Sequence, residues 1–308
     1  MSSLAPTTSW TDVKMDKMSD RSGISYFEMV QYARELLAGN DISDAEADAW
    51  YLMAYVTGMS RTDYLLRRRE PMIPGQQEAY QMLVQKRASH IPLQHLTGEQ
   101  EFMGFSFLVN EHVLVPRQDT EILVEETMEC LKRLERDRKG QEALLVLDLC
   151  TGSGCIAVSL KKLCPWIHME ASDLSPEALA VARENGRRNG AEIAWQEGDL
   201  FEPLKNKYDV IVSNPPYIPT AVIDTLSEEV RDHEPHQALD GHADGLYFYR
   251  KITEEAGSRL NPGGWLYFEI GYDQGEAVSE LMRQGGFSQI RVTRDLAGLD
   301  RVVSGQYG

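Results

Sequence analysis

Basic residues are scarce in this chain of 308 residues. Its 31 lysines and arginines are outnumbered by 48 aspartates and glutamates, and the formal net charge is −17. Nucleic-acid affinity comes mainly from lysine and arginine side chains that displace counterions from phosphates. The longest basic cluster, Arg67-Arg68-Arg69, is followed at once by Glu70 and is typical of a solvated helix end. The composition therefore disfavours a nucleic-acid-binding protein, although it does not exclude a local basic groove.

Long apolar segments are also missing. The longest candidate, residues 143–160, is interrupted by Asp148 and by Thr151-Gly152-Ser153-Gly154, so no membrane span is predicted. The first residues lack the basic and apolar regions of a secretory signal. The four cysteines are too few for a disulfide framework, and those between residues 150 and 164 lack the CxxC spacing of a zinc site. We expect a soluble, cytoplasmic protein with reduced thiols and no metal.

The remaining composition is that of an ordinary globular protein, with 42% hydrophobic and 26% charged residues. A chain of this length is too long for one ordinary domain and suits two. We expect a flexible N-terminal extension over residues 1–21 and a helical bundle over 22–91. A β-hairpin linker over 92–116 would then lead to a larger domain over 117–308.

Apolar residues at helical spacing define the predicted bundle. They indicate helices over 26–37, from a capping box at Ser43-Asp44-Ala45-Glu46 to Gly58, over 62–68 and over 76–89. Between Pro92 and Pro116 the pattern changes to alternating phenylalanines and valines broken by Gly104, which predicts the hairpin.

Strand and helix patterns alternate in the second half. This alternation predicts an α/β domain, Rossmann-like, with a mostly parallel seven-stranded sheet covered by helices on both faces. The strands are predicted over 144–149, 167–172, 192–196, 208–213, 265–270, 289–293 and 301–306.

Three acids follow or end consecutive predicted strands, as expected at a cofactor site. The first strand contains Asp148 and leads into a glycine-containing turn, Cys150-Thr151-Gly152-Ser153-Gly154. Asp173 ends the second strand 21 residues after Gly152, where an acid can accept hydrogen bonds from a ribose, and Asp199 follows the third. A bare GxG turn is a weak signal. The acids favour a cationic cofactor, S-adenosylmethionine, over a dinucleotide, and we expect all three of them around it.

A second motif, Asn214-Pro215-Pro216-Tyr217, follows the strand over 208–213. Two prolines make this loop rigid and extended. The side-chain carbonyl of Asn214 and the main-chain carbonyl of Pro215 can accept both hydrogens of a planar NH2 group, on which Tyr217 can stack. Such a clamp would aim a weakly nucleophilic nitrogen at an electrophilic methyl group, which is catalysis by positioning.

The two motifs together resemble the class I S-adenosylmethionine-dependent methyltransferases that modify amide or exocyclic amino nitrogens. Further segments resemble the PrmC/HemK family of protein glutamine methyltransferases: Pro92-Leu93-Gln94, Gly98, 101–105, 109–117, Asp244-Gly245-Leu246 and Glu269-Ile270-Gly271. The resemblance runs from about residue 25 to the end. It implies methylation of the side-chain amide N5 of the glutamine in the Gly-Gly-Gln motif of peptide chain release factors, with the helical bundle as substrate-recognition domain.

The resemblance also implies roles for individual residues. Those implied to bind S-adenosylmethionine are Thr120, Glu121, Cys150, Thr151, Gly152, Ser153, Gly154, Asp173, Leu174, Asp199, Leu200 and Asn214. Those implied to bind the substrate are Arg117, Asn214, Pro215, Pro216 and Tyr217, the last four being also catalytic. The transfer is expected to be direct and in line, without a strong general base. His233, His236 and His242 are interpreted as helix and loop polar residues.

Two positions depart from the family pattern. The family usually has glycine where Cys150 stands, so this turn must accommodate a side chain. It usually reads Pro-Arg-Pro-Glu-Thr-Glu where this chain has Pro116-Arg117-Gln118-Asp119-Thr120-Glu121, so the loop loses a proline but keeps an acid. Neither change removes a group that the chemistry needs.

Three alternatives stay open at this point. A glutamine methyltransferase acting on a ribosomal protein would use the same loop. An adenine-N6 DNA or RNA methyltransferase would use it on a flipped base but would want a basic cleft. A non-catalytic scaffold would be expected to have a damaged loop or turn. We expect a monomer whose protein partners are release factors, with part of its acidic surface facing a basic partner and with no direct contact to nucleic acid or membrane.

Overall fold

The computed structural model describes residues 23–138 and 143–308, so the predicted extension over 1–21 lies outside the described residues. The chain divides into two compact units, the first ending at Thr97 and the second running from Gly98 to Gly308. Residues 98–116 of the predicted hairpin linker therefore belong to the second unit, and residues 92–97 belong to the first.

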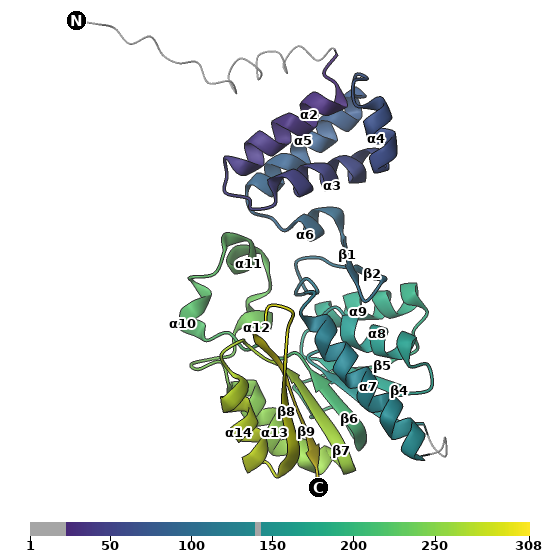
Figure 1. Cartoon of the computed structure of the whole chain (residues 1–308), viewed down its shortest axis with the longest axis vertical. Helices are drawn as coiled ribbons and strands as arrows, with labels where there is room; N and C mark the ends of the chain where they lie inside the picture. Colours follow the sequence, from purple (N-terminus) through teal and green to yellow (C-terminus); the bar gives the residue numbers. More distant parts are fainter. Residues whose placement is uncertain (1–22, 139–142) are drawn as a thin grey trace, which may run out of the picture. The chain divides into compact units, whose positions relative to one another are not determined.

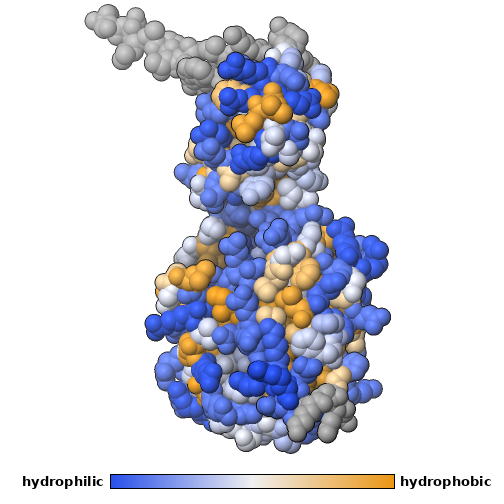
Figure 2. All heavy atoms as spheres, turned by 45° about the vertical axis from the view of Figure 1, so that its right-hand side comes forward, coloured by the Kyte–Doolittle hydropathy of each residue, from blue (hydrophilic) through white to orange (hydrophobic). Residues whose placement is uncertain are grey.

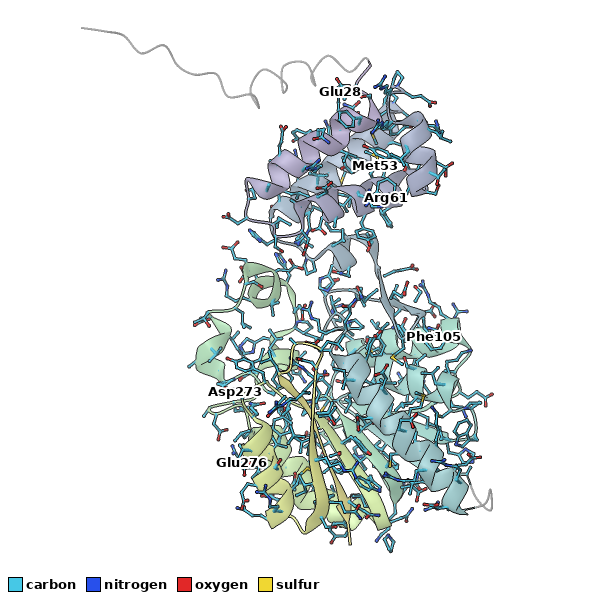
Figure 3. All side chains as sticks on the ribbon, viewed as in Figure 1. Glu28, Met53, Arg61, Phe105, Asp273 and Glu276 are labelled. Atoms are coloured by element: carbon cyan, nitrogen blue, oxygen red, sulfur yellow. The ribbon has the colours of Figure 1, made fainter. Side chains whose placement is uncertain are left out.

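The first unit is helical (Figure 1). Its helices are α2 (Tyr26–Ala38), α3 (Ala45–Thr57), α4 (Arg61–Arg67), α5 (Pro74–Ala88) and the short α6 (Leu93–Thr97). Met53, labelled in Figure 3, is fully buried in the core of this unit together with Met29 and Leu37. Inside the bundle, Arg87 Nε donates to Asp48 Oδ2 at 2.7 Å, and the pair ties α5 to α3. Four helices were predicted within a few residues of their bounds, and α6 was not predicted.

The predicted capping box of the second helix is wrong. The N-cap of α3 is Asp44, which makes no side-chain cap bond, because the Ser43 hydroxyl bonds to the Asp44 carboxylate at 3.3 Å instead. Complete capping boxes form at Ser25, before α2, and at Ser60, before α4.

The second unit contains the predicted seven-stranded sheet, in the order β5-β4-β3-β6-β7-β9-β8. Neighbouring strands from β5 to β7 are parallel, and β9 is antiparallel to both β7 and β8. The strands are β3 (Leu145–Leu149), β4 (His168–Asp173), β5 (Ala194–Glu197), β6 (Tyr208–Ser213), β7 (Leu260–Glu269), β8 (Phe287–Arg294) and β9 (Asp300–Tyr307). The hairpin is β1 (Glu99–Phe102) with β2 (Phe105–Leu108), shorter than predicted.

Helices cover both faces of this sheet (Figure 1). On one face α7 (Thr120–Arg138), α8 (Cys155–Leu163) and α9 (Pro176–Asn189) lie over side chains such as Val146 and Val210. On the other, α13 (Tyr247–Arg259) and α14 (Gly275–Gln284) pack on their neighbours Leu147 and Ile211. Successive strand residues thus serve opposite faces, as the side-chain period of two requires. This three-layer arrangement confirms the predicted α/β fold.

Several elements of the second unit differ from the sequence prediction. Helix α7 and three short helices, α10 (Thr220–Ile223), α11 (Glu228–His233) and α12 (His236–Leu239), were not predicted. Strand β7 begins at Leu260, five residues before the predicted strand over 265–270, and runs through Asn261-Pro262-Gly263-Gly264 with an irregular register opposite β6.

On the face drawn in Figure 2, hydrophilic side chains predominate and the apolar ones form small patches between them. Among the described residues, none of the helices has the length and apolar character that crossing a membrane requires.

Candidate active site

A cavity of about 430 Å³ lies at the carboxyl ends of β3, β4 and β6. Parallel strands present their carboxyl ends at one edge of the sheet, which is where ligands bind in folds of this type. Most residues predicted for the site are among those that line it: Arg117, Thr120, Cys150, Thr151, Gly152, Ser153, Asp173, Leu174, Asp199, Leu200, Asn214 and Pro216.

Four predicted residues are not among those that line this cavity. A Cβ on Gly154 would lie 3.1 Å from Ala182 and Trp195, so this glycine permits close packing of α8. The carboxylate of Glu121 accepts a hydrogen bond of 2.6 Å from the Met103 amide of the hairpin. Pro215 and Tyr217 belong to the predicted Asn214-Pro215-Pro216-Tyr217 loop, of which Asn214 and Pro216 line the cavity.

The cofactor turn, which we define as residues 150–154, depends on left-handed backbone. Cys150 has φ +59° and Gly152 has φ +54°. The Thr151 amide donates to the Ser172 carbonyl at 3.0 Å, which ties the turn to the end of β4. Because Cys150 occupies a conformation that favours glycine, its side chain is accommodated at some backbone strain, facing the cavity. Burial raises the pKa of its thiol, which keeps it neutral.

Asp148 does not line the cavity, so the expectation that it surrounds the cofactor is wrong. It is fully buried beneath the turn, where its Oδ2 accepts from the Thr151 hydroxyl at 2.5 Å and from the Ala157 amide at 3.2 Å. Burial raises the pKa of this carboxyl to about 7. Asp148 therefore fixes the conformation of the turn from behind.

Asp173 has the geometry expected of a ligand to hydroxyl groups. Its Oδ2 accepts from the Gly152 amide at 2.8 Å and its Oδ1 from the Ser175 amide at 2.9 Å. Each carboxylate oxygen keeps further acceptor capacity, and Asp173 lines the cavity. Burial raises the pKa of Asp173, but the backbone donors oppose that rise. With Asp199 it gives the cavity the acidic lining that suits a cationic molecule with a ribose.

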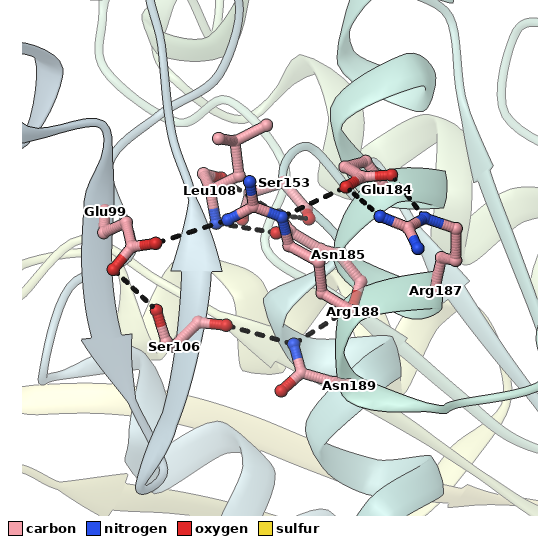
Figure 4. Close-up of polar contacts among 9 residues, drawn as sticks. All are labelled: Glu99, Ser106, Leu108, Ser153, Glu184, Asn185, Arg187, Arg188 and Asn189. Carbon is pink, nitrogen blue, oxygen red and sulfur yellow. Dashed lines mark hydrogen bonds and ion pairs between the residues drawn. The ribbon is translucent and has the colours of Figure 1, made fainter.

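Figure 4 shows how the hairpin is fastened beside the cofactor turn. The fully buried Asn185 of α9 accepts from the Leu108 amide at 2.6 Å and donates to the Leu108 carbonyl at 3.0 Å. It also donates to the Ser153 carbonyl at 2.9 Å. At the exposed edge, Arg188 pairs with Glu99 at 3.3 Å. One side chain thus joins the end of β2 to the turn that lines the cavity, a connection that the sequence analysis missed.

The loop over residues 214–217, which we call the catalytic loop after its predicted role, is held from a helix that was not predicted. Asn214 Nδ2 lies 3.5 Å from the hydroxyl of Thr120, at the start of α7. This contact turns the amide nitrogen of Asn214 toward Thr120 and leaves its carbonyl oxygen available to another donor. Thr120 is buried, so its hydroxyl has a fixed position.

Behind the loop lies a second buried acid, Glu269, at the end of β7. The Tyr217 hydroxyl donates to Glu269 Oε1 at 3.4 Å, whereas Glu269 Oε2 has no hydrogen-bond partner among the described residues. Burial raises the pKa of Glu269 to about 7, against the opposing effects of the Thr120 hydroxyl and of Arg301. Arg301 is itself held by Asp119 at 3.2 Å and by Asp295 at 3.0 Å.

A wall of the cavity that sequence reasoning missed comes from the segment over 235–242, including α12. His236 and His242, interpreted as helix and loop polar residues, lie in this wall. Arg117, which also lines the cavity, forms an ion pair with Glu234 just before this segment, and burial raises the pKa of Glu234 to about 7. A helix as short as α12 carries no recognisable apolar period, so this wall could not be predicted from the sequence.

The described residues contain no group of three or more histidines, cysteines or acids arranged to hold a metal ion. The cavity is instead lined by the left-handed backbone of the cofactor turn, by carboxylates and by apolar side chains such as Leu174 and Leu200. These residues fit S-adenosylmethionine, whose sulfonium is cationic, whose ribose donates hydroxyls and whose adenine is flat and largely apolar.

Comparison with known proteins gives matches along both units. Residues 28–98 match the family described as PrmC N-terminal domain, and residues 126–230 match the Methyltransferase small domain. The chain is 42% identical over 282 residues to the release factor glutamine methyltransferase of Geobacter sulfurreducens, covering 91% of this chain and 96% of that protein. The enzyme of the same name from Moorella thermoacetica is 41% identical over 269 residues, covering 86% and 92%. The one from Bordetella pertussis is 40% identical over 274 residues, covering 88% and 98%.

Solved structures support the fold. The hMettl16 catalytic domain, in complex with MAT2A 3'UTR hairpin 6, superposes with a TM-score of 0.53 at 16% identity, covering 72% of this chain and 81% of that chain. This likeness concerns the methyltransferase fold alone.

Proposed function

The chain belongs to the family of release factor glutamine methyltransferases, and on that premise we propose that it methylates the glutamine of the Gly-Gly-Gln motif in peptide chain release factors. The acceptor would be the side-chain amide N5 of that glutamine. The single observation that carries this proposal beyond the family is the arrangement of Asn214, whose amide nitrogen is turned toward Thr120 at the cavity wall.

S-adenosylmethionine supplies the electrophilic methyl group. The cofactor turn, Asp173, Leu174, Asp199 and Leu200 would hold it, as their places around the cavity allow. Thr120 and Asn214 would lie near its methionine end. Gly154 and Glu121 act through packing and through the hairpin, so we now propose them as supports for the site and not as direct contacts.

The chain's own contribution to the reaction is to orient the acceptor nitrogen. The side-chain carbonyl of Asn214 and the main-chain carbonyl of Pro215 would accept the two amide hydrogens, which increases the electron density on nitrogen as it attacks. Pro216 lies in the cavity wall, and the ring of Tyr217 would pack on the amide plane. Arg117, fixed by its ion pair with Glu234, would contact the substrate at the mouth.

We further propose that the protein works as a cytoplasmic monomer. The helical unit would recognise the body of the release factor while the second unit performs the transfer. The strongly negative charge of −17 suits a partner that carries basic surfaces.

The test is to incubate the protein with methyl-labelled S-adenosylmethionine and, separately, release factors, ribosomal proteins and DNA or RNA. Label in a release factor, lost when its Gly-Gly-Gln glutamine is changed to asparagine, is the expected result. Label in a ribosomal protein or in nucleic acid, with none in release factors, would overturn the proposal in favour of the corresponding alternative.

A further inference from the structure

The main chain immediately after the catalytic loop is clamped against a neighbouring segment. The Ile218 amide donates to the Leu239 carbonyl at 3.0 Å, and the Gly241 amide donates to the Ile218 carbonyl at 2.8 Å. A Cβ on Gly241 would lie 2.7 Å from the Cα of Tyr217, and one on Gly245 would collide with the Tyr217 carbonyl oxygen. The absence of side chains at both glycines lets the segment over 239–245 press directly on the backbone of Tyr217.

The Tyr217 carbonyl left in this tight space is bound by one side chain, Gln274, at the N-terminal cap of α14. Gln274 Nε2 donates to the Tyr217 carbonyl at 3.0 Å and lies 3.4 Å from the Gly245 carbonyl. Figure 3 labels Asp273 and Glu276, which flank Gln274 along the chain at this end of α14. Gln274 itself is buried, unlike most glutamines at a helix start.

The acceptor end of the same amide is also used. Gln274 Oε1 accepts from the Gly271 amide at 2.9 Å and from the Tyr249 hydroxyl at 3.4 Å. A side chain here must therefore accept on one side and donate on the other. Of the residues of this shape, glutamate accepts but donates only when protonated, and methionine offers no N–H donor at all.

From these contacts we propose that Gln274 is a positioning residue for methyl transfer, which holds the catalytic loop in its productive orientation through the carbonyl of Tyr217. The proposal rests on the proposed function of the loop. It concerns a residue that touches neither the cavity nor the acceptor amide and that acts only through Tyr217.

The physical link from Gln274 to the reaction is short. Pro215 and Pro216 fix their own φ angles, so the loop has few internal rotations and moves largely as a unit. Releasing the Tyr217 carbonyl would let its peptide rotate, which shifts the Tyr217 ring and the Asn214 carbonyl together. A misplacement of about 1 Å at a positioned reacting group costs on the order of 100-fold in rate.

The first experiment measures single-turnover methyl transfer to a release factor by wild type, Gln274→Met and Gln274→Glu at 20 °C. Gln284→Glu, on the exposed face of the same helix, controls for the added charge. We expect Gln274→Met to lower the transfer rate about 10- to 100-fold, with the affinity for S-adenosylmethionine changed less than about 3-fold. Gln284→Glu should transfer methyl groups at the wild-type rate.

The pH dependence separates a lost donor from general damage. At low pH the protonated carboxyl of Gln274→Glu can still donate to Tyr217, so its rate should approach that of wild type. As pH rises and this carboxyl ionises, its rate relative to wild type should fall about 10- to 100-fold, whereas that of Gln274→Met should stay low throughout. The titratable groups nearest position 274 are Tyr217 and Tyr249, with Asp273 beside Gly271 and Asp300 beside Gly275. They are present in every variant, and the uncharged Gln274→Met shows how their own titration changes the rate with pH.

A measurement that needs no substrate keeps this proposal distinct from the proposed function. Hydrogen exchange of the Ile218 and Gly241 amides should be at least about 10-fold faster in Gln274→Met than in wild type, with amides of β3 and β4 unchanged. If wild type methylates no release factor, the proposed function fails while the exchange result still decides the role of Gln274. Wild-type transfer rates in Gln274→Met, a flat rate ratio for Gln274→Glu across pH, or unchanged exchange at Ile218 would each overturn the inference.

Discussion

The cofactor turn and the catalytic loop lie side by side at the edge of one sheet, yet they are stabilised in different ways. The turn is held mainly by near neighbours in sequence: Thr151 bonds to Asp148 three positions before it, and Gly152 bonds to Asp173, 21 positions after it. The loop is held by partners much farther along the chain. Asn214 contacts Thr120 across 94 positions, and Tyr217 contacts Gln274 across 57.

This difference predicts that the two regions fail separately. Changes behind the turn should weaken cofactor binding and stability together, because the turn is built into the first strand and helix of the sheet. Changes in or behind the loop should lower the transfer rate and leave the cofactor bound, because the loop can shift while the turn stays in place.

The largest expected effect is that of Asn214→Ala. Losing the carbonyl that would accept an amide hydrogen should lower the methyl-transfer rate about 100- to 1,000-fold, measured in single turnovers with a release factor. Thr120→Val, which removes only the hydroxyl beside Asn214, should cost about 10-fold and serves as the graded control. Near-normal transfer by Asn214→Ala would contradict the role given to the loop.

Asn185→Leu, a change behind the cofactor turn, should weaken cofactor binding and stability together. It keeps the number of side-chain heavy atoms but leaves the Leu108 amide, the Leu108 carbonyl and the Ser153 carbonyl without their buried partner. The free energy of unfolding should fall by about 2–3 kcal/mol and the affinity for S-adenosylmethionine by about 10-fold, measured by urea unfolding and calorimetric titration. The half-buried Asn189→Ala, which removes a bond to the Ser106 carbonyl of β2 and one to its own helix, is the comparison variant on the same helix. If the two variants lowered the free energy of unfolding and the cofactor affinity equally, Asn185 would have no special role in supporting the turn.

Asp148→Asn tests the buried acid beneath the turn through pH. Because burial raises the pKa of Asp148 to about 7, the folded protein keeps a proton that the unfolded chain releases between about pH 4 and pH 7. The raised pKa of Asp148 therefore lowers the free energy of unfolding of the wild type as pH rises from about 4 to about 7. Above that range its effect on the free energy of unfolding no longer changes with pH. The free energy of unfolding of Asp148→Asn relative to wild type should therefore rise by on the order of 2 kcal/mol from pH 4 to pH 7 and then stay level. A difference independent of pH would show that Asp148 is ionised in the fold throughout.

The smallest effect is expected at the exposed edge of the hairpin. Arg188 and Glu99 are 3.3 Å apart, but their side chains are 40% and 59% exposed. Arg188→Ala should change the free energy of unfolding by less than about 0.5 kcal/mol and leave both cofactor affinity and transfer rate unaltered. A loss as large as that of Asn185→Leu would mean that the ion pair, and not the buried amide, fastens the hairpin.

The cofactor turn could be predicted from the sequence, whereas the supports of the catalytic loop could not. The strands, the turn with its left-handed glycine and the acid ending β4 all depend on local patterns, and they were predicted within a few residues. Asp148 was recognised as important but placed in the cavity, because a sequence does not show which side of a strand's end a carboxylate faces. The apolar stripe of α7, with Leu123, Thr127 and Leu131 buried, was present in the sequence, yet the helix was not predicted.

The supports of the catalytic loop were beyond reach for a physical reason. Thr120, Glu269 and Gln274 belong to three elements that meet only after the sheet has formed. The family resemblance implied Thr120 only as a cofactor contact, and nothing in the local sequence marks Glu269 or Gln274 as a neighbour of Tyr217. Glu269 was noted only as part of a family-like motif. The segment over 235–242 was missed because its helices are too short to have a period.

The most direct measurement of the central claim is tandem mass spectrometry of a release factor after incubation with the wild-type protein and S-adenosylmethionine. The account predicts a single added methyl group on the side-chain amide of the glutamine in the Gly-Gly-Gln motif, and no such group after incubation with Asn214→Ala. A methyl group on any other residue, or an unmodified release factor beside a methylated ribosomal protein or nucleic acid, would contradict it.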